Sequence, residues 1–231
     1  AVKQLRALLD DLVAQARAVP GVLGVAPFTY VKAMVFREGL TEGLVVKGVS
    51  LAAERGVTTV GHNITPRMDS IPVRTADGLP AIVLGSELAS RIGARVGDPV
   101  LLASLSGAER SALGFAPKLR KFGVVGLFTS GLYTYDSSFG FTSIPAAQEF
   151  FELGRAVTGV EIRIADMFAA PAAADEILRR VGRPGLRANN WMELNRNLFT
   201  WMQLEKTVML VILTLIVLDA AFHIVSTLVL V

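Results

Sequence analysis

The chain has 231 residues, with 23 lysines and arginines, 20 aspartates and glutamates, and a formal net charge of +3. Its basic and acidic residues are mixed along the sequence, which argues against a nucleic-acid-binding protein, because that class needs a clustered basic face. Cysteine is absent, so no disulfide or thiolate metal site can form among these residues.

The first predicted element is an amphipathic helix at 2–18, where apolar side chains recur at helical spacing. Its apolar stripe consists of Val2, Leu5, Leu8, Leu9, Leu12, Val13 and Ala16. Two interpretations are open. The helix packs on the surface of a core, or it is the outer end of a helix that emerges from a membrane before residue 1.

Short β-rich runs and helical segments follow, separated by proline and glycine turns. We expect strands at 22–35, 43–49, 81–84, 99–103, 122–128, 140–143 and 160–164, and helices at 86–93, 146–153 and 171–181. The mixture predicts an α+β fold.

Residues 104–121 connect two of these strands and are long for a hairpin connection, which usually has two to five residues. The predicted tip is small and apolar, and the returning limb is basic. The tip comprises Ala112, Leu113, Gly114, Phe115, Ala116 and Pro117, and the limb carries Lys118, Arg120 and Lys121. The segment is either a docking element or a loop folded back on its own domain.

A long helix is expected at the C-terminus of the sequence. Asn190 and Glu193 form a capping box, and nothing interrupts the helical pattern from Trp191 to Val231. Residues 207–231 are apolar and long enough to cross the roughly 30 Å hydrocarbon core of a bilayer. We therefore expect one continuous helix that spans a membrane and enters the extramembranous domain.

Asp219 and His223 are the ionisable groups of this apolar run and lie one helical turn apart. We expect them to hydrogen-bond each other or a partner helix, facing away from lipid. Gating, substrate passage and helix association are all open as roles. A catalytic triad with Ser226 is disfavoured, because triads converge from different elements on a cleft.

Sequence motifs for catalysis and nucleotide binding are missing. GxxxxGK[ST], HExxH, GxSxG and GxGxxG do not occur in these residues. With only His62 and His223 present, we expect no metal site and no cofactor, and His62 is expected in a solvated loop. The Tyr133, Tyr135, Asp136 cluster is interpreted as a turn whose polar groups are satisfied by the aspartate.

Four stretches, in order, resemble the permease subunits of the lipoprotein-releasing (Lol-type) ABC transporter of Gram-negative bacteria. They are LGSELASRIGARVGD (84–98), SGLYTYDSS (130–138), TGVEIRI (158–164) and WMELNRNLFTWMQLEKTVM (191–209). This family belongs to the mechanical-transmission class of ABC transporters.

The resemblance implies a four-span permease with a two-lobed periplasmic domain between its first two spans. A porter-like lobe would comprise 1–50 and 155–206, with its first helix extending from span one. A β-rich lobe at 51–154, bearing the hairpin 104–121, would be inserted between them, and 207–231 would be the second span.

The resemblance also implies a non-enzymatic subunit that extracts lipoproteins from the bacterial inner membrane and passes them to a periplasmic carrier. ATP would be bound by a separate ATPase subunit, and a second permease subunit would complete a homo- or heterodimer. The carrier would dock on the hairpin, through Leu113, Gly114, Phe115, Ala116, Pro117 and Lys118, with Arg120 as a basic support. Lipoprotein acyl chains would contact Leu198, Phe199, Met202 and Met209.

This sequence departs from the family pattern at two places. A proline is expected about where Ala112 stands, and an apolar residue and Asn are expected in place of Asp219 and His223. Carrier-docking and lipoprotein-receiving roles, or both in one homodimer, therefore stay open. The alternatives are a permease of the same class serving export or cell-wall hydrolase activation, and a membrane-anchored enzyme using Asp219 and His223.

Overall fold

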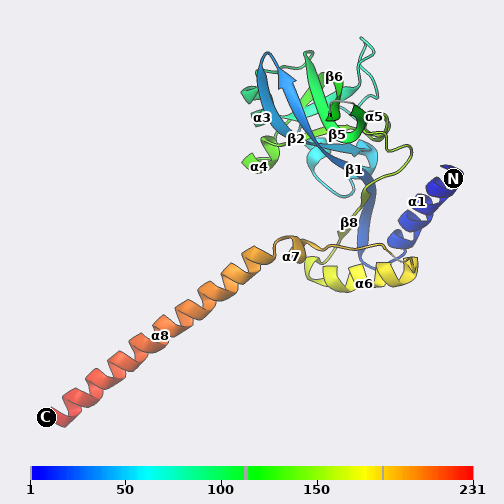
Figure 1. The fold of residues 1–231 in the computed structure, drawn as a ribbon. Helices are drawn as coiled ribbons and strands as arrows, with labels where there is room; N and C mark the ends of the chain where they lie inside the picture. The colour runs from blue at the N-terminus through cyan, green and yellow to red at the C-terminus, as the bar shows by residue number, and fades with distance from the viewer. Residues whose placement is uncertain (1, 112–113, 184, 231) are drawn as a thin grey trace. The chain divides into compact units, whose positions relative to one another are not determined.

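The computed structural model describes the backbone of residues 2–111, 114–183 and 185–230, and their side chains except at 2–8, 105–111, 114–116, 198–199 and 230. The chain divides into two compact units, Ala1–Met167 and Phe168–Val231, each of which is described by itself. Figure 1 shows the elements along the chain.

The first unit contains all of the described strands. Its elements are α1 (Val2–Arg17), β1 (Val22–Arg37), β2 (Leu40–Val49), α2 (Leu51–Glu54), the 3-10 helix η1 (Val60–His62), β3 (Ile64–Thr65), β4 (Ala81–Gly85), α3 (Ser86–Arg91), β5 (Pro99–Ser111), β6 (Gly114–Phe128), α4 (Tyr133–Asp136), β7 (Phe139–Ser143), α5 (Ile144–Phe150) and β8 (Gly159–Ile164). A 3-10 helix, η2 (Met167–Ala169), precedes α6 (Ala170–Val181), α7 (Trp191–Leu194) and α8 (Arg196–Leu230).

Six strands of the first unit close into a barrel. β1 pairs with both β2 and β5 in antiparallel fashion. From β2 the ring continues through β7 and β4 to β6, which pairs with β5 and completes it. Closure leaves each of these six strands with two neighbours, while β3 and β8 pair outside the ring.

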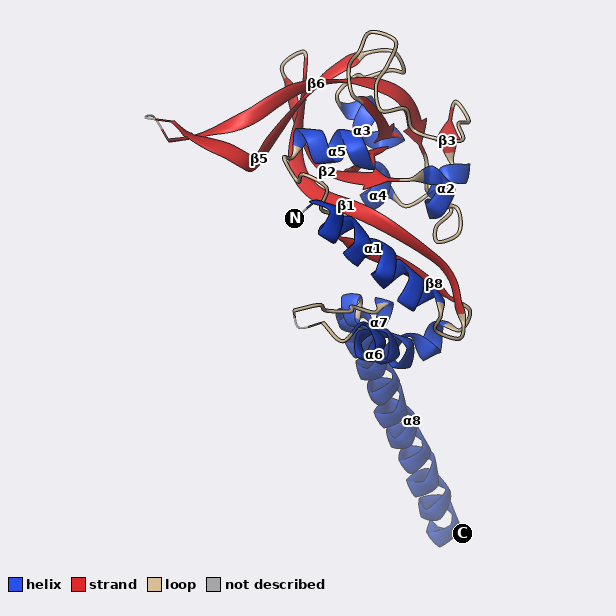
Figure 2. Ribbon diagram, turned by 90° about the vertical axis from the view of Figure 1, so that its right-hand side faces the viewer, coloured by secondary structure: helices blue, strands red, loops and turns tan. Residues whose placement is uncertain are grey.

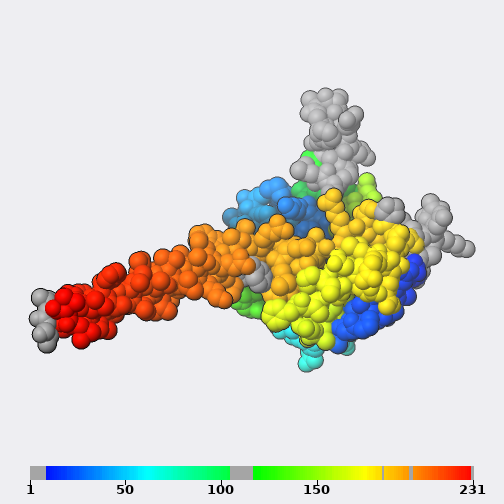
Figure 3. All heavy atoms as spheres, turned by 90° about the horizontal axis from the view of Figure 1, so that it is seen from below, coloured from blue at the N-terminus to red at the C-terminus, as the bar shows by residue number. Residues whose placement is uncertain are grey.

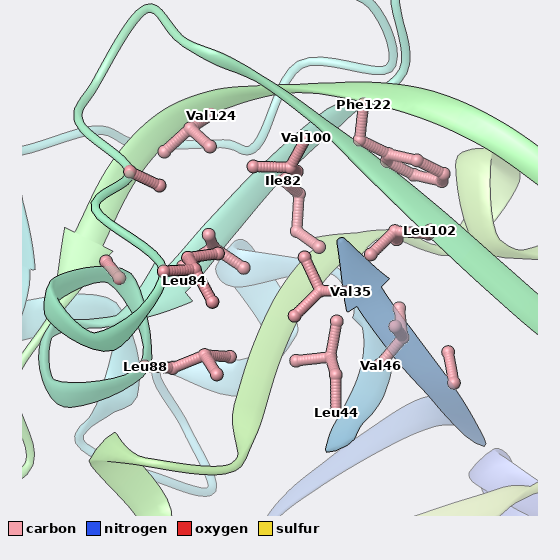
Figure 4. Packing of buried hydrophobic residues seen from close by; sticks show 14 of the residues in the cluster. Val35, Leu44, Val46, Ile82, Leu84, Leu88, Val100, Leu102, Phe122 and Val124 are labelled. Atoms are coloured by element: carbon pink, nitrogen blue, oxygen red, sulfur yellow. The ribbon is translucent and has the colours of Figure 1, made fainter. Parts of the chain in front are cut away.

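The barrel interior is filled by every second residue of its strands, as the two-residue period of a strand requires. Nine larger interior side chains are at most 3% exposed: Val35, Leu44, Val46, Ile82, Leu84, Val100, Leu102, Phe122 and Val124. Figure 4 shows their packing. Gly140 of β7 also faces inward, where an added Cβ would lie 3.1 Å from Leu44 Cδ1 and 3.2 Å from Ile82 Cδ1. Each large interior side chain contributes about 1.5–3 kcal/mol through burial.

β4 is buried on both of its faces, which explains its unbroken apolar sequence. Ile82 and Leu84 point into the barrel, while Ala81 and Val83 belong to a second cluster with Phe128 and Phe141. The ring centroids of Phe128 and Phe141 lie 4.8 Å apart in an edge-to-face arrangement. The second cluster therefore seats α2 and β3 on the outside of the barrel.

β1 is long enough to belong to two pairings. Its residues 22–28 pair with β8, and its residues 29–37 pair with β2. Helix α1 contacts β1, as Figure 2 also shows. Ala16 is buried and Leu9, Leu12 and Val13 are half-buried, so the predicted amphipathic helix is confirmed over its described side chains.

The strands expected at 99–103 and 122–128 are too short, whereas a hairpin at 104–121, which the resemblance implies, is present. β5 continues to Ser111 and β6 begins at Gly114, so most of the segment is a two-stranded hairpin and not a loop. Strand pairing extends through small and polar residues there, because the partner strand supplies the backbone hydrogen bonds whatever the side chains are.

The prediction of one continuous helix from Trp191 is also wrong. α7 ends at Leu194 and α8 begins at Arg196, with Asn195 between them. The Asn195 side chain donates to the Trp191 carbonyl oxygen at 2.7 Å, a local bond of the kind that competes with the helix. The predicted cap is confirmed, since the Asn190 side chain accepts a hydrogen bond from the Glu193 amide at 3.0 Å.

The expected mixture of helices and strands, followed by an apolar C-terminal helix, is thus confirmed. The expected bounds of two lobes stay a prediction.

Candidate functional site

The hairpin of β5 and β6 projects from the barrel (Figure 2). Its pairing is regular from Pro99 opposite Gly123 to Ser104 opposite Lys118, and resumes with Glu109 opposite Ala116. Between these pairs, residues 105–108 of β5 oppose Pro117 alone. Proline has no amide hydrogen to donate to the ladder, which accounts for an irregularity at this point.

The predicted docking residues fall on the outer part of this hairpin. Leu113 lies outside the described residues, as does Ala112. Gly114, Phe115 and Ala116 have a described backbone in β6 but no described side chain. Of the remaining docking residues, Pro117 is exposed, and Lys118 and Arg120 are half-buried.

The basic limb of the hairpin is tied to helix α5 by ion pairs. Arg120 Nη2 lies 2.6 Å from Glu149 Oε1, and Arg74 Nη2 lies 3.0 Å from both oxygens of the same carboxylate. Lys118 pairs with Glu152. The hydrogen bond from Arg120 lowers the pKa of Glu149, with a smaller effect from Arg74, against a partial opposing effect of burial. Arg120 therefore orients the base of the hairpin through α5.

A buried charge cluster, absent from the sequence-based expectations, joins the barrel to β8. Lys47 Nζ lies 2.8 Å from Glu54 Oε1 and 2.7 Å from Glu161 Oε2. The Lys47 and Glu54 side chains are 8% and 0% exposed, and Lys47 also lies over the Phe28 ring. The available signal was a lysine in the middle of an apolar strand, because a buried lysine requires a countercharge.

The Tyr133, Tyr135, Asp136 cluster forms the predicted turn. Buried Asp136 accepts hydrogen bonds from the Ser130 amide and hydroxyl, both at 2.7 Å, and from the Gly131 amide at 3.2 Å. Tyr133 accepts a hydrogen bond from Arg91 at 2.7 Å. The aspartate is thus committed to the turn, and this interpretation is confirmed. His62, at the end of η1, is exposed as expected.

A cavity of about 620 Å³ lies in the first unit beside α1, α2 and α5. Its lining is mostly apolar, with Arg155 as its charged residue and three serines, Ser50, Ser70 and Ser143. Among the described lining residues, no histidine or carboxylate accompanies these serines. The cavity suits an apolar group and gives the serines no neighbouring base.

The second unit contains the membrane-spanning candidate. Residues Thr200–Val229 of α8 form an apolar helix with a mean hydropathy of 2.6. The rest of the described chain buries no part of its most apolar stretch. Figure 3 displays one face of α8, in orange to red, as an uncovered surface. Such a surface is stable in a bilayer and not in water.

The predicted acyl-chain contacts lie at the start of this helix. Met202 and Met209 are 56% and 64% exposed, while the side chains of Leu198 and Phe199 lie outside the described set. Leu198, Met202 and Met209 share one face by helical spacing, and Phe199 lies beside it. These contacts lie in the second unit, whereas the hairpin of β5 and β6 lies in the first.

Asp219 and His223 lie on α8, exposed by 76% and 80%. Their closest approach, from His223 Nε2 to Asp219 Oδ1, is 3.7 Å. This separation is too long for a hydrogen bond, so the expected bond between the two is not formed within the helix. The two groups are within ion-pair distance when His223 is protonated, and the expected hydrogen bond to a partner helix stays a prediction.

The barrel with its hairpin, together with an apolar helix able to cross a bilayer, defines a membrane protein with a sizeable domain outside the lipid. The chain belongs to the family of MacB-like periplasmic core domains, which its residues 3–180 match.

Two curated relatives indicate which group of proteins within this family the chain resembles. The chain is 34% identical over 213 residues to the lipoprotein-releasing system transmembrane protein LolC of Neisseria meningitidis serogroup B, covering 90% of this chain and 49% of that protein. It is 28% identical over 213 residues to the corresponding LolE of Haemophilus influenzae, covering 91% and 49%. The resemblance to lipoprotein-releasing permeases is thereby confirmed. The chain spans about half the length of the curated relatives it matches.

Among solved structures, the periplasmic region of MacB from Actinobacillus actinomycetemcomitans aligns with a TM-score of 0.47 and 13% identity, covering 80% of this chain and 81% of that one.

Proposed function

We propose that this chain is part of a permease subunit of an ABC transporter that releases lipoproteins from the bacterial inner membrane. The similarity to LolC carries the proposal, because it extends over 213 residues. The match to the core-domain family ends at residue 180, so the similarity to LolC must include part of the membrane helix region. A relationship confined to a widely shared periplasmic domain would be weaker support.

In this proposal the chain performs no catalysis. A separate ATPase subunit binds ATP and supplies the energy, and a second permease subunit completes the membrane part. The chain itself requires no metal or cofactor. Its domain lies in the periplasm, and α8 is the second span of the permease.

The hairpin of β5 and β6 is the proposed docking site for a soluble lipoprotein carrier. It extends from a closed barrel, which offers a rigid base. The ion pairs of Arg120 with Glu149 and of Lys118 with Glu152 hold the returning strand against α5 and the turn that follows it. Carrier binding at the outer hairpin would then use a surface whose direction is fixed before the encounter.

The two-lobed organisation belongs to the same proposal. A lobe of 1–50 and 155–206 would connect the membrane to an inserted lobe of 51–154. Within these bounds β1 lies in the first lobe and pairs with β8 of the same lobe and with β5 of the inserted lobe, so this strand would link the two lobes. Movement of the membrane helices would reach the hairpin through this strand.

Photo-cross-linking tests the docking role. Phe115 is replaced by p-benzoylphenylalanine in the full-length protein, in cells that contain the complete transporter. Capture of a soluble lipoprotein carrier is expected. Capture of an outer-membrane channel or of a cell-wall hydrolase regulator would instead favour one of the other permease functions. Leu23 is the control position and should capture no carrier. It is exposed near the start of β1, whereas the end of β1 pairs with the hairpin strand β5.

The acyl-chain contacts have their own test. Changing Phe199 and Met202 to Asp places charges where apolar chains would lie, so ATP-dependent lipoprotein release should fall about tenfold or more. Leu204→Asp, on the other side of α8, is the matched control for the cost of a charge at this depth. Normal release by the Phe199→Asp, Met202→Asp variant would remove these residues from the substrate path.

A further inference from the structure

The cavity of about 620 Å³ in the first unit is lined by parts of the chain that are far apart in the sequence. Leu9 of α1, Pro27 of β1 and Ile144 of α5 line it, together with Ser70 and Arg155 from two connecting segments. Small-molecule sites have volumes of roughly 300–1,000 Å³ and are mostly apolar, with a few polar groups that orient the ligand. The cavity thus has the volume and the lining of a ligand site.

Both connections between the two proposed lobes line this cavity. Val49, Ser50 and Leu51 lie where the chain enters the inserted lobe of 51–154, and Arg155 lies where the chain leaves it. Ligand sites occur preferentially at interfaces between domains. A molecule in the cavity would therefore contact both lobes at once.

Apolar side chains form the buried part of the cavity, and polar side chains lie at its exposed part. Val49, Leu51 and Ile71 are at most 6% exposed, whereas Ser50 and Arg155 are exposed. Neither the Arg155 guanidinium nor the Ser50 hydroxyl bonds to another residue in the part of the chain that the structure describes. These two groups are free to bind a ligand whose oxygen acceptors lie at one end of an apolar chain.

We infer that the cavity holds one acyl chain of a lipoprotein on its way from the membrane to the soluble carrier. Arg155 donates hydrogen bonds to the ester oxygens at the head of the chain, and the apolar part of the cavity surrounds the chain itself. Because the occupant is the substrate of the proposed permease, this site depends on that function. The cavity and the docking hairpin belong to the same unit, so both lie in the proposed periplasmic domain.

The chemistry of release selects a lipoprotein acyl chain as the occupant. Exposure of each CH₂ group to water is unfavourable, so a chain that leaves the bilayer needs an apolar surface until the carrier receives it. A membrane phospholipid has no such need, because its chains stay in the bilayer. The described lining contains no carboxylate, and its charged residue is an arginine, which suits ester oxygens and does not suit a cationic ligand.

Photo-cross-linking from within the cavity tests the occupant. Ser70, an exposed residue of the lining, is replaced by p-benzoylphenylalanine in the full-length protein, in cells that contain the complete transporter and are grown with alkyne-labelled palmitate. Irradiation should yield an adduct that contains both the label and a lipoprotein polypeptide. Its yield should be several-fold higher than from Ser90, an exposed serine outside the lining. Labelled phospholipid as the only adduct, or equal yields at the two positions, would overturn the assignment.

Two variants test the space and the charge of the cavity, each with the cross-linker at Ser70. Ala52→Trp fills the space from an exposed position of the lining and should remove most of the capture. Arg155→Gln should lower capture about three- to tenfold, because a charged hydrogen-bond donor is lost. The controls are Ala172→Trp and Arg95→Gln, at exposed positions outside the lining, and both should show wild-type capture. Yields are compared per copy of the protein recovered in the membrane.

Lipoprotein release in the same cells separates this site from the proposed function. Normal release together with undiminished capture in Ala52→Trp or in Arg155→Gln would contradict the acyl-chain site and leave the permease function standing. Failure of the wild-type transporter to release lipoproteins would contradict the function itself, whatever the cross-linker at Ser70 captures.

Discussion

Lys47 is held between two carboxylates, one of them fully buried, where β1 passes from β8 into the barrel. Changing Lys47 to Met leaves the Glu54 carboxylate buried without its countercharge and should lower the free energy of unfolding by about 3–5 kcal/mol. The double variant Lys47→Met, Glu54→Leu should recover most of this loss, because it removes both charges. Far-UV circular dichroism during urea unfolding in detergent is the measurement, since Trp191 and Trp201 both lie in the second unit. A double variant as unstable as the single one would show that the cluster has another role.

Glu149 gives the base of the hairpin a dependence on pH. Arg120, and then Arg74, lowers the pKa of Glu149 from its ordinary value of 4.5. Because the folded-state pKa lies below the unfolded one, the contribution to stability is fully present above pH 4.5 and is lost as the pH falls through the folded value. The side chain is 44% exposed, so the contribution is about 1 kcal/mol or less after solvent screening.

The corresponding variant is Glu149→Gln, compared with wild type by urea unfolding at several pH values. The difference in unfolding free energy should be greatest near pH 7 and disappear in acid. Asp69→Asn is the matched control. Asp69 also pairs with an arginine, Arg55, whose hydrogen bond lowers the pKa of Asp69, but the Asp69 side chain is 93% exposed, so its variant should show a smaller difference. A difference for Glu149→Gln that grows as the pH falls would contradict the assignment.

At the scale of elements, the hairpin is separable from the barrel that supports it. The pairs that close the barrel use residues 101–103 of β5 and 123–128 of β6. Replacing 106–115 with a two-residue turn should therefore leave the thermal unfolding temperature within a few degrees of wild type while abolishing co-purification of the soluble carrier. A shortened protein that unfolds early would show that the outer hairpin supports the barrel.

Local sequence signals predicted most strands but not their connections. The apolar runs of β2, β4 and β7 were identified because burial of a strand leaves a continuous or alternating pattern. Closure of the barrel depends on pairs such as Met34 with Ala103 and Val45 with Phe139, which are far apart in the sequence. No single segment carries information about such a partner.

The errors have similar causes. The outer hairpin has few β-branched residues, so residue patterns end the first strand at 103 and begin the second at 122, although pairing between them extends to Ser111. At the break between α7 and α8, the Asn195 side chain bonds the Trp191 carbonyl, a contact that a propensity argument cannot detect. The Lys47 cluster needed Glu161, 114 residues further along the chain.

At the scale of the whole molecule, family membership connects features that the two units show separately. The first unit provides a closed barrel with a long hairpin, and the second provides an apolar helix with a polar face. The sequence predicted the class of protein because four ordered stretches resemble one family, and similarity to LolC over 213 residues confirms that resemblance. The docking role of the outer hairpin residues and the acyl-chain contacts at 198–199 stay proposals.

Lipoprotein release itself is the most direct measurement of the central claim. The full-length protein, with its ATPase subunit and any second permease subunit, is reconstituted in liposomes with a lipoprotein, and transfer to a soluble carrier is followed on addition of ATP. The wild-type complex should transfer the lipoprotein, and the complex with the shortened hairpin should hydrolyse ATP without transferring it to the carrier. A wild-type complex that hydrolyses ATP but leaves the lipoprotein in the membrane would contradict the proposed function, and normal transfer by the shortened protein would contradict the docking role of the hairpin.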